Sequence, residues 1–370
     1  MSKKSPRIAI ISGELSGDQY ASDLVDSVRQ RIPNAEFEGL AGTGAEAAGL
    51  SPWQIDRPKP DMLFTQILSH FRHFSAMLQT INNQLQQSPP DLLVLIDYSG
   101  LNLRVAKIAH QLGIPVFYYI PPKVWAWARW RMVKLKKYVN WVAPIYPFET
   151  QFFRDNGVAS FLVKHPFIAK INHDQPSATD AIALLPGSRG QEIKHLLPIM
   201  LQTAYLLVRH HPRCTFRIFC AEPDKEPLLR EHIENWSANL PIELVTTDKQ
   251  SQLQRCRAAV VCSGTAAFEC AMLSVPMVIV YRTQWLNYQI GRLLFQPRWF
   301  GLPNLILQRD AIPELLQGQC QPERILQLLE QLMADGVHRE QQMADLARIK
   351  QQMTEHADCQ SIGHVVADLL

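Results

Sequence analysis

The sequence predicts an α/β protein made of two Rossmann-like, doubly wound domains that face an interdomain cleft. The chain has 370 residues, more than one hydrophobic core usually serves, so we expect two domains. Short β-branched or apolar runs alternate with helical stretches, which indicates βαβ units and parallel sheets. A polar segment with two prolines, residues 164–179, separates two series of such runs. The domains are expected over residues 1–168 and 169–349, and a C-terminal helix at about 350–370 is a candidate to pack back on the first.

Nine runs are candidate strands, four before the linker and five after it. In open parallel sheets the ligand lies outside the carboxyl ends of the strands. We therefore expect the functional site in the interdomain cleft, in the turns that follow these strands. The strands are Ile8–Ser12, Leu92–Ile96, Val116–Ile120 and Trp141–Pro144 in the first series, and Ala181–Leu185, Thr215–Cys220, Ile242–Val245, Ala258–Cys262 and Met277–Tyr281 in the second.

The composition excludes several classes of protein. Hydrophobic residues make up 47% and charged residues 19%, which disfavours disorder, and 37 basic residues against 34 acidic ones are too balanced for a nucleic-acid coat protein. The seven cysteines include no CxxC pair, so we expect reduced thiols, no metal site and a cytoplasmic location. The apolar region Ala258–Tyr281 is interrupted by Gly264, Glu269 and Pro276, so contact with a membrane would be peripheral.

The first motif, Ser12–Asp18, joins the first strand to a helix. Gly17 would let the backbone approach a ligand, and Ser16 with the helix N-terminus could donate hydrogen bonds to an anion. An ordinary turn with Ser16 or Asp18 as helix cap explains the same residues. Spacing alone leaves both roles open.

A second motif, Leu185–Ile193, repeats this arrangement at the first strand of the second half. Gly187 and Ser188 precede Arg189, whose planar guanidinium can donate paired hydrogen bonds to a diphosphate. The alternative is a solvent-exposed arginine in a turn. The glycines on both sides leave room for a ligand, so we favour phosphate contact.

A third motif, Ser263–Glu269, follows a strongly apolar strand. The small residues Ser263, Gly264, Thr265 and Ala266 allow a helix to begin close to a phosphate. Glu269 lies one turn into that helix among apolar residues, where a carboxylate needs a partner, and ribose hydroxyls could supply it. We therefore interpret this motif as part of a nucleotide site.

Asp97 lies directly after the apolar strand Leu92–Ile96 and is followed by Tyr98. A carboxylate at that cleft-facing position could act as a general base. It could also form the turn or cap the next helix, and position alone slightly favours that structural role.

Three segments rich in aromatic or apolar residues could contact a membrane. One, beginning at Trp125 and including Trp130, runs into a basic stretch with Lys134, which would also suit stacking on nucleic acid or a core helix with a solvated face. The others are Phe64–Leu78 and Leu293–Phe295 with Trp299 and Phe300. Candidate docking residues are Phe64, Leu68, Phe71, Trp130 and Lys134.

Taken in order, the motifs resemble those of the lipid-A-disaccharide synthase family across nearly the whole chain. They are SGExSGD from residue 12, IDxxxxN from residue 96 ahead of GIPVFYYIPPxVWAW, LLPGSRGxEI from residue 184, SGTAAxE from residue 263 and LPN from residue 302. The resemblance implies a GT-B fold with the acceptor bound mainly by the first domain and UDP by the second. By the same resemblance Asp97 matches the general base, Arg189 and the Ser263–Thr265 turn match the UDP site, and Asn304 matches a further active-site position.

The reaction implied is inverting and metal-independent and takes place peripherally at the inner membrane. Diacylglucosamine passes from UDP-2,3-diacylglucosamine, the donor substrate, to 2,3-diacylglucosamine 1-phosphate, with release of UDP and no cofactor. The resemblance leaves the oligomeric state open and implies no nucleic-acid partner.

Departures from the family pattern lie in the first half. They are at Thr43–Ala45, at Leu63 and Phe64, at Gly100–Asn102 and at Lys164. They keep alternatives open: another GT-B UDP-sugar transferase or epimerase with a different acceptor, or a non-catalytic paralogue that binds the membrane surface.

Overall fold

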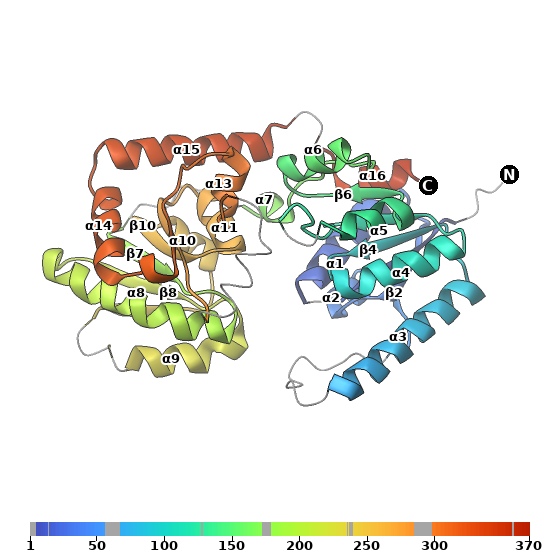
Figure 1. The fold of residues 1–370 in the computed structure, drawn as a ribbon, viewed down its shortest axis with the longest axis horizontal. Coiled ribbons are helices and arrows are strands. Elements are labelled where there is room, and N and C mark those ends of the chain that lie inside the picture. Colours follow the sequence, from blue (N-terminus) through green and yellow to red (C-terminus); the bar gives the residue numbers. More distant parts are fainter. Residues whose placement is uncertain are drawn as a thin grey trace. The chain divides into compact units, whose positions relative to one another are not determined.

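The computed structural model describes residues 5–13, 15–55, 67–126, 129–171, 179–234, 236, 240–284, 298–356 and 359–370. The chain divides into two compact units (Figure 1). The first unit combines Met1–Pro166 with His356–Leu370, and the second is Phe167–Glu355. The first unit is therefore assembled from both ends of the chain.

The first unit contains one six-stranded parallel sheet, in the order β3-β2-β1-β4-β5-β6. This is the doubly wound order, in which the winding reverses between β1 and β4 and leaves a crevice at their carboxyl ends. The strands are β1 (Arg7–Ser12), β2 (Glu36–Leu40), β3 (Ser51–Pro52), β4 (Leu92–Ile96), β5 (Val116–Tyr119) and β6 (Trp141–Ala143).

Helices cover both faces of this sheet, which explains why its central strands are continuous apolar runs. On one face Ala9 and Leu93 pack against α3 (Ile67–Gln87), α4 (Ser99–Gln111) and α5 (Arg131–Tyr138). Because side chains alternate along a strand, Ile8 points to the opposite face, where α1 (Leu15–Arg29) contacts β1. The remaining helices before the linker are α2 (Thr43–Ala47) and α6 (Pro147–Asp155).

The last helix, α16 (Ile362–Asp368), packs on α1 of the same unit. Gly363 makes this contact close, because a Cβ atom there would lie 2.2 Å from the backbone oxygen of Ser27. Its N–H donates a hydrogen bond to Ser27 Oγ at 3.1 Å. The C-terminal segment is thus part of the packing of the first unit.

The second unit repeats the same winding in a second parallel sheet, in the order β12-β11-β10-β7-β8-β9. Here the reversal lies between β7 and β10. The strands are β7 (Ala181–Leu185), β8 (Thr215–Phe219), β9 (Ile242–Val245), β10 (Ala258–Cys262), β11 (Met277–Tyr281) and β12 (Glu314–Leu316).

One face of the second sheet packs on α8 (Gly190–His210) and α14 (Pro322–Met333). Helix α8 buries Ile193, Leu197 and Leu201, one residue per turn, so its apolar stripe matches the helical period. The other helices among the described residues are α7 (Pro166–Ala169), α9 (Glu226–Glu234), α10 (Lys249–Gln254), α11 (Thr265–Met272), α13 (Leu302–Leu307) and α15 (Val337–Thr354), with short 3₁₀ turns at Pro223–Lys225 and Gln317–Gln319.

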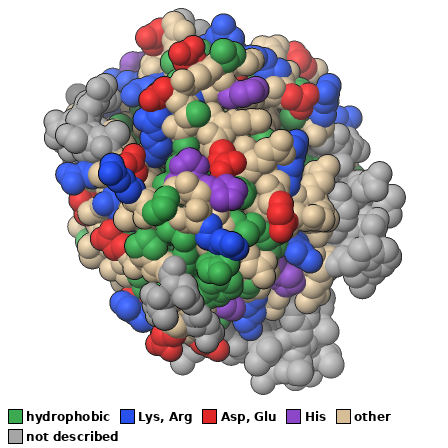
Figure 2. Space-filling view, turned by 90° about the vertical axis from the view of Figure 1, so that its left-hand side faces the viewer, with side chains coloured by type: hydrophobic (Ala, Val, Ile, Leu, Met, Phe, Trp, Pro, Cys, Tyr) green, Lys and Arg blue, Asp and Glu red, His purple; other side chains and the backbone are tan. Residues whose placement is uncertain are grey.

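Figure 2 looks at one end of the second unit, where acidic and basic side chains are interspersed and hydrophobic side chains gather beside histidines. His210 and His211 both lie beside Glu330, with shortest nitrogen-to-oxygen distances of 2.8 and 3.5 Å. The two signs of charge are mixed, so this face does not present a field of one sign.

All nine predicted strands are present, each ending within one residue of its expected bounds. Three strands were missed: β2, β3 and β12. The apolar region Ala258–Tyr281 forms β10, α11 and β11. No helix in the described part of the chain is long and apolar enough to cross a membrane.

Candidate active site

The first-unit motif turns lie side by side at the point where the winding reverses. Gly13 follows β1 and Tyr98 follows β4, and a Cβ atom on Gly13 would lie 2.1 Å from the Tyr98 ring. Gly17 is buried against Ser12, whose Oγ would be 2.2 Å from a Cβ at that position. Helix α1 therefore begins close against the strand. The backbone of Ser16 lies in its first turn, whereas the Ser16 side chain and Glu14 are outside the described residues.

Asp97 and Tyr98 have left-handed backbone conformations, with φ of 48° and 37°. Non-glycine residues pay about 1–2 kcal/mol for this conformation, so other interactions must hold it. The Asp97 carbonyl accepts hydrogen bonds from Tyr118 Oη at 2.6 Å and from Asn102 Nδ2 at 2.8 Å. Asn102 also donates to the Ile96 carbonyl at 3.0 Å. The hydrogen bonds to the Asp97 carbonyl therefore fix the turn that presents the Asp97 carboxyl group.

Burial raises the pKa of the Asp97 carboxyl group, while the Lys123 charge and the Tyr98 N–H act in the opposite direction. A base whose pKa is brought closer to neutral accepts a proton more readily, provided that it stays ionised. The environment of Asp97 therefore suits a general base.

Sequence reasoning missed a second group of titratable side chains in the first unit. Glu149 is buried and accepts a hydrogen bond from Trp125 Nε1 at 2.8 Å; burial raises its pKa to about 7, partly offset by Lys123. Burial and then the Lys123 charge lower the pKa of His165 to about 4, and its Nε2 lies 3.5 Å from Tyr146 Oη. The Lys123 charge thus acts on Asp97, Glu149 and His165 together. The sequence did offer one sign of this group: Lys123 lies three residues beyond Ile120, the end of a predicted strand.

In the second unit, the Gly187–Arg189 turn lies at the N-terminus of α8. Gly187 has a φ of 107°, and a Cβ there would lie 2.4 Å from Glu192 Oε2, so glycine is required. The Arg189 side chain is 82% exposed and its Nη1 lies 3.3 Å from Glu192 Oε1. An exposed pair of this kind contributes little, so Arg189 can exchange it for a diphosphate. Ser188 is also exposed.

The Ser263–Ala266 turn follows β10, the strand beside β7. Gly264 has a φ of 145° with open space where a Cβ would be, and α11 begins at Thr265. The first N–H groups of a helix have no partner within it, so those of Thr265 and Ala266 can meet an anion. Ser263 Oγ instead donates to the Phe300 carbonyl at 2.9 Å.

The charge of Arg189 reaches the carboxyl ends of two neighbouring strands. It lowers the pKa of Cys262, on β10, and of Tyr281, on β11, against the dominant effect of burial, which raises both. One turn into α11, burial raises the pKa of Glu269 to about 7, with Lys249 acting in the opposite direction. The predicted nucleotide residues of the second unit therefore lie together at the carboxyl ends of its central strands.

Asn304, assigned by resemblance, is buried in α13 and makes four hydrogen bonds. Its Nδ2 donates to the Ile312 carbonyl at 2.8 Å and to Glu314 Oε1 at 2.7 Å, and its Oδ1 accepts from the N–H groups of Ala311 and Ile312 at 2.9 and 2.8 Å. Two donors and two accepted bonds use the capacity of an amide side chain. Asn304 thus holds the approach to β12.

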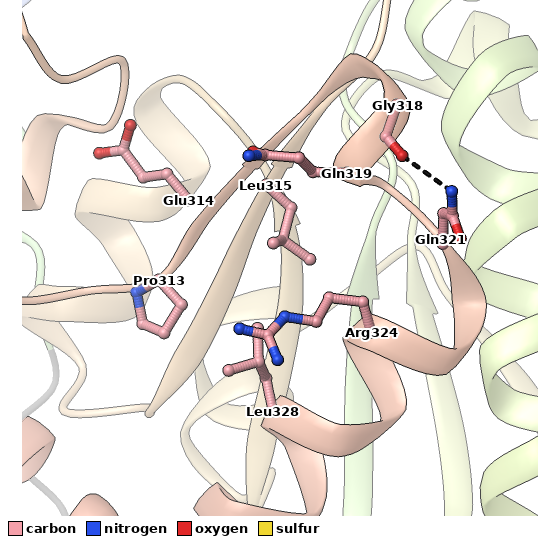
Figure 3. A pocket seen from close by; sticks show the side chains of 8 residues that line it. All are labelled: Pro313, Glu314, Leu315, Gly318, Gln319, Gln321, Arg324 and Leu328. Atoms are coloured by element: carbon pink, nitrogen blue, oxygen red, sulfur yellow. Dashed lines mark hydrogen bonds between the residues drawn. The ribbon is translucent and has the colours of Figure 1, made fainter.

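A pocket of about 480 Å³ lies beside β12 and α14 (Figure 3). Glu314 is the residue that it shares with the Asn304 network, and Gln319, Gln321 and Arg324 are exposed. None of the predicted site residues lines it, so the chemistry of the motifs lies elsewhere in the unit. Its lining residues are Pro313, Glu314, Leu315, Gly318, Gln319, Gln321, Arg324 and Leu328.

The predicted docking residues are only partly described. Trp130 is 61% exposed, and its ring has Lys134 Nζ at 5.2 Å and the Arg131 guanidinium at 5.4 Å from its centroid. Val133, on the next turn, is 70% exposed. Phe64 and the side chains of Leu68 and Phe71 lie outside the described residues, as does the segment Leu293–Phe295.

Among the residues that the structure describes, no group of three or more His, Cys, Asp or Glu side chains could hold a metal ion. All seven cysteines are free thiols, six of them buried.

Comparison with known proteins places this geometry in context. A family model described as lipid-A-disaccharide synthetase matches residues 8–367. The lipid-A-disaccharide synthase of Nitrosococcus oceani is 33% identical over 364 residues, covering 95% of this chain and 94% of the relative. Among solved structures, Acinetobacter baumannii MurG has a TM-score of 0.59 at 16% identity, with 99% of each chain covered. A UDP co-structure of S. aureus MnaA has a TM-score of 0.61 at 11% identity, with 98% and 95% covered. These structures share the two-domain α/β architecture of GT-B proteins.

Proposed function

The chain belongs to the lipid-A-disaccharide synthase family. We propose that each unit uses the point where the winding of its sheet reverses for a different part of the reaction, the first unit for proton transfer and the second for donor binding. As a member of this family it is a glycosyltransferase of lipid A biosynthesis, with a UDP-sugar donor and a lipid-linked sugar acceptor. The observation that carries the proposal is that the motif residues of each unit fall where the winding of its sheet reverses.

The substrates proposed are UDP-2,3-diacylglucosamine as donor and 2,3-diacylglucosamine 1-phosphate as acceptor. An acceptor hydroxyl oxygen attacks the anomeric carbon of the donor from the face opposite UDP, so the configuration inverts. The bond from that carbon to the diphosphate oxygen breaks, and its electron pair leaves with UDP. The hydroxyl proton passes to a base on the enzyme.

Asp97 is the base in this scheme. Its carboxyl group follows a buried strand, its backbone is held by Tyr118 and Asn102, and burial raises its pKa. A base must be fixed within hydrogen-bond reach of the proton it takes, and a turn tied down by its own carbonyl provides that constraint. Lys123 supplies a positive charge that favours the ionised carboxylate before reaction.

The donor diphosphate is held by the Arg189 guanidinium and by the N–H groups at the start of α11. Fixed donors of this kind stabilise the charge that develops on departing UDP. Glu269 accepts hydrogen bonds from the ribose hydroxyls. Of the other predicted residues, Gly187, Ser188 and Gly264 allow close approach of the backbone, while Ser16 and Gly17 place a second helix N-terminus in the first unit.

The enzyme docks peripherally on the cytoplasmic side of the inner membrane through the first unit. Diacylated substrates leave a bilayer only at high cost, so a surface of apolar and basic side chains near the site is required. The exposed side chains of Trp130, Val133 and Lys134 have this composition. Aromatic rings at the headgroup level and lysines facing anionic lipid both favour such docking.

The test is disaccharide formation by the purified protein. It is incubated with the two proposed substrates in mixed micelles, and both the disaccharide and UDP are quantified, with and without a chelator. We expect equimolar products, unchanged by the chelator. Release of UDP without the disaccharide would point to a different acceptor, and failure to bind UDP at all would refute the donor assignment.

A further inference from the structure

The half-buried Glu314 carboxylate, at the start of β12, holds a loop at Phe300 and Gly301 that contacts the Ser263–Ala266 turn. Glu314 Oε2 accepts a hydrogen bond from the Phe300 N–H at 2.8 Å, and Oε1 accepts one from the Gly301 N–H at 3.0 Å and one from Asn304 Nδ2 at 2.7 Å. Burial raises the pKa of Glu314, and these three donors act in the opposite direction. A buried carboxylate is retained only when its oxygens are hydrogen-bonded, as here.

The other side of the same loop holds Ser263. The Phe300 carbonyl accepts the hydrogen bond from Ser263 Oγ at 2.9 Å. One residue, Phe300, therefore connects Glu314 to Ser263 through its N–H and its C=O. These three residues come from separate parts of the sequence, and no local pattern predicts their contact.

The packing of the loop leaves little freedom for an alternative. A Cβ atom on Gly301 would lie 2.5 Å from Ile279 Cδ1 and 3.0 Å from Glu314 Oε1, so only glycine brings this backbone so close to β11 and to the carboxylate. Asn304 holds the other end with all four of its hydrogen bonds. The position of the Phe300 peptide is therefore set by Glu314.

The hydrogen bond to Phe300 uses the only proton of the Ser263 hydroxyl, so Ser263 cannot donate it to a phosphate as well. The groups that can donate are the N–H groups at the start of α11, two residues further on. Ser263 directly precedes Gly264, whose φ of 145° turns the chain into α11, so the position of the Ser263 peptide sets where that helix begins.

We infer that Glu314 is a positioning residue of the donor site: through Phe300 it holds Ser263, and Ser263 orients the N–H groups of Thr265 and Ala266 toward the donor diphosphate. This inference rests on the proposed function. In this inference Ser263 and Glu314 affect nucleotide affinity indirectly, without contacting the nucleotide.

The experiment is a double-mutant cycle read by calorimetric UDP affinity. Glu314→Gln keeps the side-chain shape but places an amide NH₂ against backbone N–H groups, and Ser263→Ala removes the hydroxyl that binds Phe300. Each should raise the UDP Kd by about 2- to 30-fold, the range for residues that act through a network. The double variant should be no weaker than the worse single variant, because both break one connection. Ser263→Thr, which keeps the hydroxyl, should restore affinity.

The matched control is Asp310→Asn. Asp310 accepts hydrogen bonds from Arg298 and from Trp299 Nε1 in the same loop but, among the described residues, makes no hydrogen bond to Ser263, so UDP affinity should stay at the wild-type value. Additive losses in the cycle, an unchanged Kd in Glu314→Gln, or an equal loss in Asp310→Asn would each overturn the inference. If Glu314→Gln does not fold, the Ser263→Ala and Ser263→Thr pair decides the question. Failure of the wild-type protein to bind UDP would refute the proposed function instead.

Discussion

The two units share one winding but differ in what they place at the reversal. In the first unit the segments that follow β4, β5 and β6 carry the titratable groups Asp97, Glu149 and His165 and the charge of Lys123, which acts on all three. In the second, the ends of β7 and β10 lead to glycine-containing turns, helix N-termini and Arg189. Under the proposed function, the same backbone topology supports proton transfer in one unit and anion binding in the other.

The strand order of a doubly wound fold therefore predicts where a site lies, whereas the side chains at that place determine its chemistry. A donor site that depends on backbone N–H groups tolerates few changes, because the backbone conformation must be preserved.

The sharpest way to break the comparison is Asp97→Asn. If proton transfer belongs to the first unit, the loss of the base should lower turnover by about 10²–10⁴-fold. The UDP Kd should stay unchanged, because the nucleotide is bound by the second unit. Steady-state kinetics and calorimetry on the same preparation measure both.

Stability is the control for this substitution. Unfolding of the Asn variant would show that Asp97 serves mainly as a turn residue, and the search for the base would move to Glu14 or Asp18. Wild-type turnover in a folded Asn variant would remove Asp97 from the mechanism.

Arg189→Ala tests the second unit. Losing a charge-assisted hydrogen bond to the diphosphate should weaken UDP binding by about 1.5–3 kcal/mol. Thermal stability should change little, because the Arg189–Glu192 pair is exposed. Calorimetry with Arg213→Ala, an exposed arginine of the same unit, provides the comparison; equal affinity in all three proteins would exclude Arg189 from the site.

Glu149 and Glu269 form a matched pair, one in each unit, and burial raises the pKa of both from 4.5 to about 7. The folded protein therefore binds more protons than the unfolded chain between about pH 4.5 and 7. The stability contributed by each group is complete below pH 4.5 and is lost as the pH rises to 7. Replacing either with Gln should remove at most about 3 kcal/mol of the decline in unfolding free energy over that window. The melting temperature, measured across the same pH range, should then fall less steeply.

Nucleotide affinity distinguishes the two glutamates. If the Glu269 carboxylate accepts ribose hydrogen bonds, UDP affinity in the wild type should increase several-fold as the pH rises through 7, and Glu269→Gln should abolish that increase. Glu149→Gln should keep it. A pH-independent UDP affinity in the wild type would contradict the role given to Glu269.

The smallest effect is expected at the membrane. Lys134→Ala should reduce binding to anionic vesicles several-fold at low salt, since one basic side chain near the surface contributes about 1 kcal/mol. Trp130→Ala should also weaken binding, because it removes an aromatic ring placed at the headgroup level. Vesicle flotation measures this, with Arg213→Ala in the second unit as the charge-matched control. Peripheral docking is wrong if the wild-type protein does not float with the vesicles.

Much of the fold could be predicted, because buried strands of a parallel sheet are continuous apolar runs. The strands that were missed lack this signal. Strand β2 (Glu36–Leu40) has Glu, Phe, Glu and Gly in its first four positions, while β3 and β12 have two and three residues and lie at sheet edges. Short or charged strands are defined by their neighbours rather than by their own composition.

The candidate site was predictable only where its residues adjoin a strand. Arg189 and Gly264 follow strands in the sequence, so the motif pattern located them. The contacts of Trp125 with Glu149 and of Glu314 with Phe300 join residues 24 and 14 positions apart. The sequence contains no local sign that these side chains meet. Asn304 was found by resemblance, and its four hydrogen bonds became visible only in the folded chain.

The return of α16 to the first unit has a consequence for the order in which the protein forms during translation. The second unit, Phe167–Glu355, is complete in sequence before the last fifteen residues, His356–Leu370, have been added. Domains fold as units while they emerge from the ribosome. The unit that is synthesised first is therefore expected to finish folding last, with the α1 surface around Ser27 uncovered until residues 356–370 have emerged.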